Sequence, residues 1–124
     1  MAYRVTVSAR FEAAHNLIDY AGGPEPLHGH SYKVEIVLEA EELQRHDLAV
    51  DFVAAKKALD AVAKEFDYTY LNEHPAFAGR NTSAENLARY FAERLEASGA
   101  IGSSRVAEVI VWEGPENRAT YRAR

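Results

Sequence analysis

Two histidines, His28 and His30, are the residues of this sequence best suited to chemistry, because they stand two positions apart at the start of an alternating apolar run, residues 32–38. In a β-strand, residues i and i+2 project from the same face, so the two imidazoles are predicted to lie side by side. Neutral imidazole is a good zinc ligand, and a catalytic zinc site needs three protein ligands and one open position. A third ligand is therefore expected from another element.

An earlier strand supplies that ligand. Apolar and polar residues alternate over residues 3–11, which is the period of a half-buried strand, and the pattern leads to His15. The loop that follows, residues 16–27, contains glycines and prolines that end regular structure. A connection of this length favours an antiparallel pair of strands, which would bring His15 to His28 and His30. We predict that these three histidines hold one zinc ion.

Two helices are predicted in the middle of the chain. The first follows Asp51, which can cap a helix, and ends near Asp67. The second begins at Thr82, which has capping-box spacing with Glu85, and ends at residues 98–99. We interpret Asp51, Thr82 and Glu85 as helix caps rather than substrate contacts. The apolar positions of the first helix recur with the helical period and are Phe52, Ala55, Leu59, Val62, Ala63 and Phe66.

A period of two returns near the end of the sequence and predicts two more strands. Residues 114–117 form a turn into the last of them, residues 119–121. The order strand, strand, helix, helix, strand, strand predicts an α+β fold, with an antiparallel four-stranded sheet and two helices on one face. Because such a sheet has two open edges, we expect a homo-oligomer that continues the sheet between subunits. On the earlier of these strands, one side is predicted to carry Val106, Ile110 and Trp112, and the other Ala107, Val109, Val111 and Glu113.

Composition narrows the classes of function. The chain has 124 residues and is predicted to form one domain, residues 1–124, with one modest core. Cysteine is absent, which excludes disulfides and thiol nucleophiles and suits a reducing cytoplasm. The net charge is −5 without a basic stripe in the sequence, and no apolar signal region or membrane span is visible. We expect a cytoplasmic protein that binds neither nucleic acid nor membrane.

Six segments spread over nearly the whole chain carry a resemblance to a known family. They are Phe11-x-Ala-Ala-His15, Leu27-His-Gly-His30-Ser-Tyr, Val50-Asp51-Phe52, Asp67-x-x-x-Leu71-Asn72, the run from Thr82 to Ala88, and the late Glu113. A lone His-x-His is common, whereas this ordered set is specific. The sequence resembles the 6-pyruvoyltetrahydropterin synthase and 6-carboxytetrahydropterin synthase family.

The resemblance implies a fold, a metal and a ligand. The fold is the tunnelling fold, in which sheets and paired helices assemble as trimers around a barrel and commonly stack into hexamers, with active sites between subunits. The metal is zinc on His15, His28 and His30. The ligand is a pterin, whose ring would be held by the carboxylate of Glu113, because a carboxylate can accept two N–H donors from a guanidine-like edge.

The sequence departs from the family pattern at two proton-handling positions. Members that make the pyruvoyl or carboxy product carry a cysteine shortly before the His-Gly-His, where this chain has Glu25 instead of any thiol. They also carry a histidine after the aspartate that matches Asp67, and this chain has Tyr68 there. Glu25 resembles the glutamate of the branch that cleaves the dihydroneopterin side chain for folate synthesis. We therefore predict Glu25 as the catalytic base. Asp67 and Tyr68 are further catalytic candidates, and so is His74, because imidazole titrates near neutral pH.

The leading hypothesis is a zinc-dependent lyase that cleaves the side chain of dihydroneopterin or its triphosphate. Two alternatives stay open. One is a family member that has lost the usual relay and performs another zinc chemistry on a pterin or purine-like ligand. The other is a non-catalytic pterin-binding oligomer.

Overall fold

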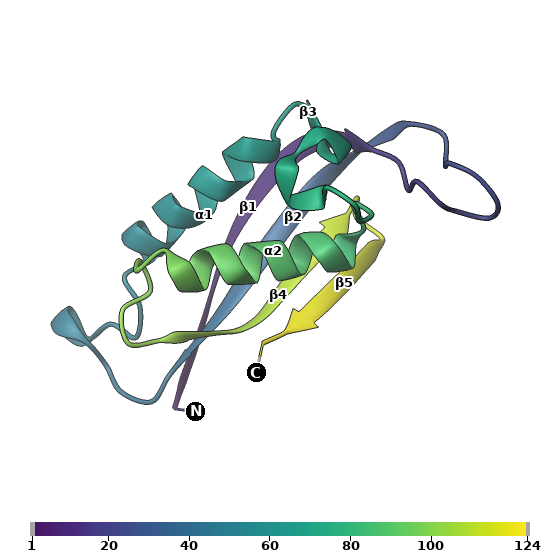
Figure 1. Ribbon diagram of the computed structural model, residues 1–124. Coiled ribbons are helices and arrows are strands. Elements are labelled where there is room, and N and C mark those ends of the chain that lie inside the picture. The colour runs from purple at the N-terminus through teal and green to yellow at the C-terminus, as the bar shows by residue number, and fades with distance from the viewer. Residues whose placement is uncertain (1, 124) are drawn as a thin grey trace.

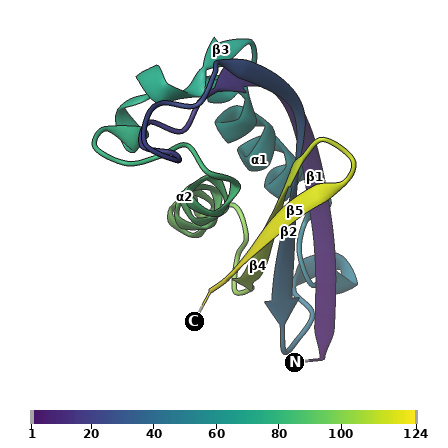
Figure 2. The same cartoon turned by 90° about the vertical axis from the view of Figure 1, so that its right-hand side faces the viewer.

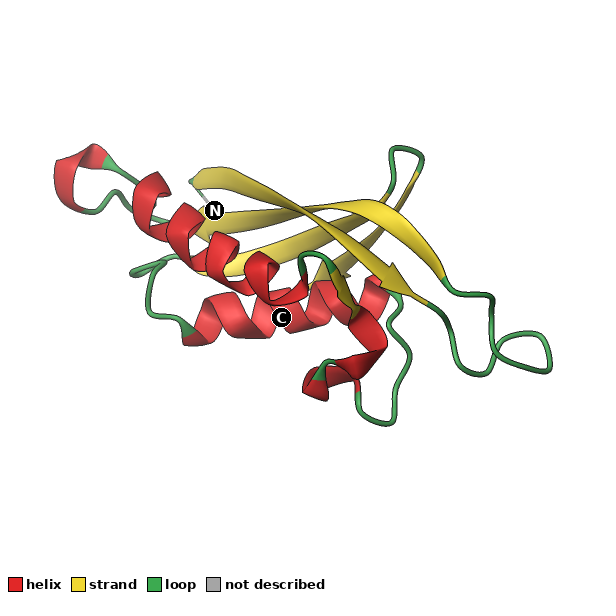
Figure 3. Ribbon diagram, turned by 90° about the horizontal axis from the view of Figure 1, so that it is seen from above, coloured by secondary structure: helices red, strands yellow, loops and turns green. Residues whose placement is uncertain are grey.

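Five strands and two helices form the protein in the computed structural model, which describes residues 2–123 (Figure 1). Both helices lie on the same side of the sheet, whose opposite face carries no helix (Figure 2 and Figure 3). The predicted α+β class, with two helices on one face, is confirmed. In chain order the elements are β1 (Tyr3–His15), β2 (His28–Ala40), η1 (Arg45–Asp47), α1 (Phe52–Phe66), β3 (Thr69–Tyr70), η2 (Leu71–Glu73), η3 (Pro75–Phe77), α2 (Ala84–Ala97), β4 (Arg105–Glu113) and β5 (Asn117–Arg122), where η marks a short 3₁₀ turn.

The sheet has the strand order β3-β1-β2-β4-β5, and four of its strands, β1, β2, β4 and β5, pair antiparallel in that order. β1 and β2 pair along their whole length, from Tyr3 opposite Ala40 to His15 opposite His28. The predicted count of four strands was one too few, because β3 pairs in parallel with the end of β1. A strand of two residues is too short to show a hydrophobic period, which is why the sequence pattern did not reveal it.

A β-bulge in β4 corrects the predicted faces of that strand. Leu38 pairs with Val106, whereas the preceding Val37 pairs with Glu108, so that Ala107 is the extra residue. A bulge of this kind reverses the alternation of side chains beyond it. Val106 therefore lies in the core together with Val109 and Val111, and the prediction that it shares a side with Ile110 and Trp112 was wrong.

Side-chain caps fix the starts of the two helices. The carboxylate of Asp51 accepts a hydrogen bond from the Val53 backbone N–H at 2.9 Å, as predicted for the cap of α1. In α2 the cap is Ser83, whose hydroxyl accepts from the Asn86 N–H at 3.2 Å. The prediction that Thr82 caps this helix was wrong, because Thr82 lies one residue before the cap and its side chain is used elsewhere. None of the helices within residues 2–123 has the length and apolar character needed to cross a membrane.

Aromatic rings join the sheet to both helices at the centre of the core. Phe11 of β1 stacks on Tyr32 of β2, with ring centroids 4.8 Å apart, and its ring is 5.7 Å from that of Phe66 in α1 and 6.0 Å from that of Phe91 in α2. Phe11 is 1% exposed. Phe52, which the helical period placed on the buried side of α1, is instead 52% exposed, because it lies at the first turn, beyond the edge of the core.

Phe11→Ala is expected to lower the free energy of unfolding by about 3–5 kcal/mol, the usual loss for a large aromatic side chain in a core. The matched control is Val53→Ala, at a helix position that is 77% exposed, where the change should stay below about 0.5 kcal/mol. Urea unfolding followed by circular dichroism, at one fixed protein concentration, measures both. Equal losses in the two variants would contradict the central position of Phe11.

Candidate metal and substrate site

Three histidines meet where β1 ends and β2 begins. His15 is directly opposite His28 in the sheet, and His30 follows on the same face two residues later. One ligand nitrogen from each ring can be chosen so that all three lie within 4.8 Å of one another. The structure therefore brings together the three residues that the sequence predicted as metal ligands, and the group can hold one metal ion.

Two of the imidazoles are oriented by hydrogen bonds from their Nδ1 atoms. His15 Nδ1 lies 2.9 Å from the carbonyl oxygen of Thr82, and His28 Nδ1 lies 2.9 Å from that of Pro26. A carbonyl only accepts, so each Nδ1 carries the proton and donates it. The lone pair of each ring is then on Nε2, the arrangement by which outer groups orient metal-binding histidines.

The third imidazole, His30, has a buried nitrogen without a hydrogen-bond partner in the part of the chain that the structure describes. Its Nε2 is buried and has no hydrogen bond within residues 2–123. Burial lowers the pKa of His30, and the neighbouring His15 and His28 lower it further against the opposing effect of Glu113. The neutral form, which is the form that binds metals, is thus favoured. An unpaired buried nitrogen and a donor set of neutral imidazoles both fit a zinc ion.

Glu113 faces the histidines from the end of β4. Its two carboxylate oxygens lie 3.9 Å from His15 Nε2 and 4.0 Å from His30 Nε2. The glutamate is one quarter exposed, so one side of the carboxylate is open to a ligand. With the histidines it lines an open pocket of about 320 Å³, whose other walls are Leu17, Glu25, Ser83, Ala84 and Glu85. Glu85, interpreted from the sequence as part of a cap, therefore also lines this pocket.

Glu25 enters the same pocket from the loop between β1 and β2, which extends beyond the sheet in Figure 1. The loop is held to the chain just after His15. The Glu25 carboxylate accepts from the Leu17 N–H at 3.0 Å, the Glu25 N–H donates to the Leu17 carbonyl at 2.9 Å, and the Asn16 side chain donates to the Glu25 carbonyl at 3.1 Å. Its carboxylate lies 4.0 Å from His28 Nδ1. These bonds place Glu25 beside the metal ligands rather than free in solvent.

Comparison with known proteins agrees with this geometry. The 6-pyruvoyl tetrahydropterin synthase family model matches residues 4–124. The chain belongs to this family. Among curated relatives, the dihydroneopterin monophosphate aldolase of Pyrococcus furiosus is 33% identical over 94% of both chains. The 6-carboxy-5,6,7,8-tetrahydropterin synthase of Aquifex aeolicus is 26% identical over 98% of this chain and 99% of its own.

Solved structures of the same family share the fold. The 6-pyruvoyl tetrahydropterin synthase of Caenorhabditis elegans superposes with a TM-score of 0.80 at 23% identity, over 98% of this chain and 96% of that one. A Plasmodium vivax 6-pyruvoyltetrahydropterin synthase superposes with a TM-score of 0.77 at 20% identity, over 98% and 97%. That structure is of a variant in which a glutamate, described as a catalytic residue, is replaced by alanine. The subunit fold expected for this family is thereby confirmed.

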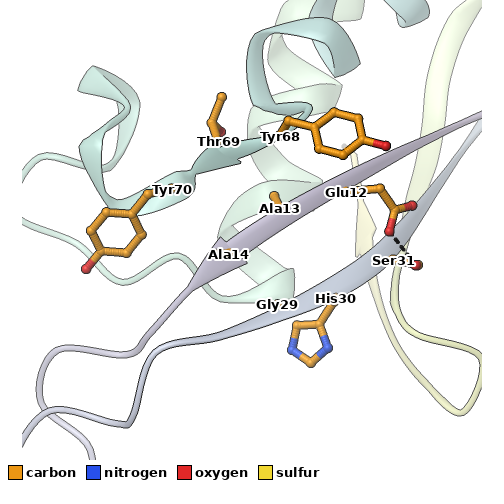
Figure 4. Close-up of a pocket in the computed structure, with 9 residues that line it drawn as sticks. All are labelled: Glu12, Ala13, Ala14, Gly29, His30, Ser31, Tyr68, Thr69 and Tyr70. Carbon is orange, nitrogen blue, oxygen red and sulfur yellow. Dashed lines mark hydrogen bonds between the residues drawn. The ribbon is translucent and has the colours of Figure 1, made fainter.

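Asp67 and Tyr68 lie outside the histidine pocket of their own chain. The Asp67 carboxylate accepts from the Glu12 N–H at 2.9 Å. Tyr68 is 84% exposed and has a φ of 57°, an unfavourable conformation for an aromatic residue. It lines a larger hollow with Glu12 and His30, and Figure 4 shows its ring near Glu12 while the His30 ring points away from it. Within one chain, neither Asp67 nor Tyr68 lines the pocket that contains all three histidines and Glu25.

His74 also lies apart from the metal ligands, in a polar cluster between the helices. Its Nδ1 accepts from the Ala76 N–H at 3.1 Å, so its Nε2 carries the proton and donates to Glu65 at 3.1 Å. Glu65 accepts in addition from Tyr90 and Arg94, at 3.0 and 2.9 Å. The Nε2 atom of His74 thus fixes the loop after β3 onto α1, and its Nδ1 fixes the start of η3. The residue does not line the pocket that contains Glu25.

Thr82 and Asn72 are the site residues that sequence reasoning missed. Thr82 is fully buried, and besides its carbonyl its hydroxyl oxygen lies 3.2 Å from His15 Nδ1. The hydroxyl donates to the Asn72 side chain at 3.0 Å, and Asn72 in turn donates to the Asn16 carbonyl at 2.7 Å. This chain of bonds orients His15 from the loop that precedes α2. Both residues stand in segments that resemble the family, which was the available signal, but Thr82 was assigned to the helix cap.

His28→Ala and His30→Ala are each expected to remove most of the bound metal, because two imidazoles hold a divalent ion far less tightly than three. The matched control is His46→Ala, whose histidine is exposed in η1 and should leave the metal content unchanged. Elemental analysis of purified protein, expected to give about one ion per chain in the parent, measures all of them. Full occupancy in both ligand variants would contradict the assignment.

Proposed function

We propose that this protein is a zinc-dependent lyase that cleaves the side chain of dihydroneopterin or of a phosphate ester of it. The observation that supports this choice within the family is the position of Glu25. A carboxylate held by the chain at the edge of the three-histidine group can act as a general base. The chain contains no cysteine that could perform the thiol-dependent reactions.

The curated relatives support two different reactions. One is named an aldolase that acts on dihydroneopterin monophosphate, and the other a synthase of 6-carboxytetrahydropterin. The presence of Glu25 and the absence of cysteine favour the first reaction for this chain. The Plasmodium vivax protein, which shares the fold, has a glutamate described as a catalytic residue, and this is consistent with a catalytic carboxylate here.

The proposed reaction breaks the bond between the first two carbons of the substrate side chain. Zinc, when bound by His15, His28 and His30, supplies a Lewis acid that lowers the pKa of a substrate hydroxyl. Glu25 accepts the proton of the hydroxyl on the second carbon, whose oxygen becomes the carbonyl oxygen of an aldehyde. The electron pair of the broken bond stays on the first carbon, stabilised by the adjacent C=N bond of the ring. Addition of a proton to that carbon gives a hydroxymethyl pterin.

Glu113 is proposed as the anchor of the pterin ring. Its carboxylate is aimed at the pocket and can accept two parallel N–H bonds from the guanidine-like edge of a pterin, the strong bidentate arrangement. Glu113 and Glu25 both line the pocket, Glu113 near His15 and His30 and Glu25 near His28. This arrangement would hold the ring on one carboxylate and present the side chain to the other.

Tyr68 is proposed to act in the site of a neighbouring subunit within a trimer or hexamer. Its ring is almost fully exposed and its backbone is held at positive φ, so its own chain gains no packing from it. A phenol is protonated near neutral pH and could return the proton to the ring-side carbon. Asp67, one residue earlier, holds this segment to β1 through the Glu12 N–H.

Glu25→Gln is expected to reduce turnover by about 10²- to 10⁴-fold, the usual contribution of a positioned general base, while the zinc content stays unchanged. Glu42→Gln, at an exposed loop position, is the control and should retain full activity. The assay incubates zinc-loaded protein with dihydroneopterin, its monophosphate and its triphosphate, and separates the products by chromatography. An active Glu25→Gln enzyme would exclude Glu25 as the base, and efficient formation of the carboxy product would contradict the proposed reaction.

Glu113→Ala is expected to weaken binding of a hydroxymethyl pterin by roughly 2–5 kcal/mol, the range for removing one partner of a buried charged contact. Glu116→Ala, three residues later and exposed, is the control. Fluorescence titration measures the affinity, and elemental analysis of the same samples measures zinc. Loss of zinc together with loss of pterin binding would show that Glu113 ligates the metal instead of anchoring the ring.

A further inference from the structure

The face of the sheet that carries no helix is seen in Figure 2. The strand register places a row of three cations and one indole across this face. The register places Arg10 of β1 opposite Lys33 of β2, Lys33 opposite Trp112 of β4, and Trp112 opposite Arg118 of β5. We call these four residues the cationic row. They are far apart in the sequence, and only the pairing of the strands brings them together.

The first two cations of the row are not paired with a carboxylate in the part of the chain that the structure describes. Within residues 2–123, neither Arg10 nor Lys33 forms an ion pair or a side-chain hydrogen bond. The carboxylates in the two adjacent rows hydrogen-bond to neutral donors instead of to these cations: Glu35 accepts from the Trp112 indole N–H at 2.6 Å and Glu12 accepts from the Ser31 hydroxyl at 2.5 Å. Like charges directly opposite each other destabilise a sheet. The fold therefore carries a repulsion that an anion would relieve.

The cationic row lines a pocket, and the indole of Trp112 forms one wall of it. Arg10, Lys33 and Trp112 line a pocket of about 290 Å³ together with Ser31, Gly114 and Pro115. The indole is fixed from two sides, by its bond to Glu35 and by the Arg118 guanidinium, which lies 5.0 Å from its ring centroid. Because successive residues of a strand point to opposite faces, Trp112 lies on the other side of the sheet from Glu113. This hollow is therefore separate from the histidine pocket.

We infer that the cationic row binds the phosphate groups of a small phosphorylated compound. A guanidinium binds phosphate oxygens through paired N–H donors and an ammonium adds a point charge, so Arg10 and Lys33 together match a dianion. Trp112 supplies a flat apolar wall for the part of the ligand that follows the phosphate. The inference does not depend on the reaction proposed for the histidine pocket, because it concerns a different face and different residues.

The test uses Trp112, the single tryptophan of the chain, as its reporter. Titration of the zinc-loaded protein with inorganic tripolyphosphate at low ionic strength is expected to give a saturable change in fluorescence that weakens as salt is added. Lys33→Met and Arg10→Met should each weaken binding by about tenfold, the loss of one charge-assisted contact. Lys57→Met, which removes the same charge from an exposed helix position, should leave the affinity unchanged. Calorimetry repeats each titration without relying on the indole.

Two further arms separate the sources of the signal. The His28→Ala variant, which keeps the row intact, should bind tripolyphosphate as the parent does, whereas loss of binding there would place the anion at the metal ligands and overturn the inference. An equal loss in Lys57→Met, or no saturable binding by either method, would overturn it as well. Competition by neopterin triphosphate but not by neopterin would identify the phosphate as that of a pterin, and its absence would exclude a pterin phosphate as the ligand of the row.

Discussion

The register between β1 and β2 is the constraint on which the other features depend. These strands pair residue by residue over thirteen positions, from Tyr3 opposite Ala40 to His15 opposite His28. A shift of one residue would send every side chain of one strand to the opposite face. The same register stacks Phe11 on Tyr32 in the core, gathers the histidines at one end, and sets Arg10 against Lys33 on the other face. Core, metal ligands and cationic row are thus outcomes of one alignment.

Burial and charge explain why three histidines can lie this close together in the absence of a metal without strong charge repulsion. Three protonated imidazoles with rings about 5 Å apart would repel one another strongly, and His15 is only 3% exposed. Burial and mutual proximity favour the neutral form at His30. The Tyr32 ring, edge-on to His15 and His30, separates the group from the aromatic core. Burial also raises the pKa of the Tyr32 hydroxyl, so that wall of the site stays uncharged.

Local patterns predicted most of the fold and the centre of the site, because those features are local. The period of two placed His28 and His30 on one face, and the cap at Asp51 followed from residue type and position. The failures have physical causes. A bulge at Ala107 cannot be recognised from alternating apolar and polar residues alone. Thr82 was assigned to a helix cap because its hydrogen bond with His15, which is distant in the sequence, exists only in the folded chain. The cationic row was invisible for the same reason, since its members are neighbours only through strand pairing.

In the oligomer that we propose, the segment after α1 would link assembly to chemistry. β3 is the outer strand beside β1, and β5 forms the opposite edge. Both edges of the sheet therefore present backbone groups that another chain can pair with. Tyr68 stands directly before β3, exposed and at positive φ, while Asp67 and the Tyr68 N–H bind the two backbone groups of Glu12. The backbone of Tyr68 is held firmly, yet its exposed ring adds no packing to its own chain and points away from the three histidines. The conformation of Tyr68 is accounted for if the sheet edge that joins two subunits also brings this proton donor to the neighbour's site. A chain unable to assemble would then bind metal and ligand but convert the substrate slowly.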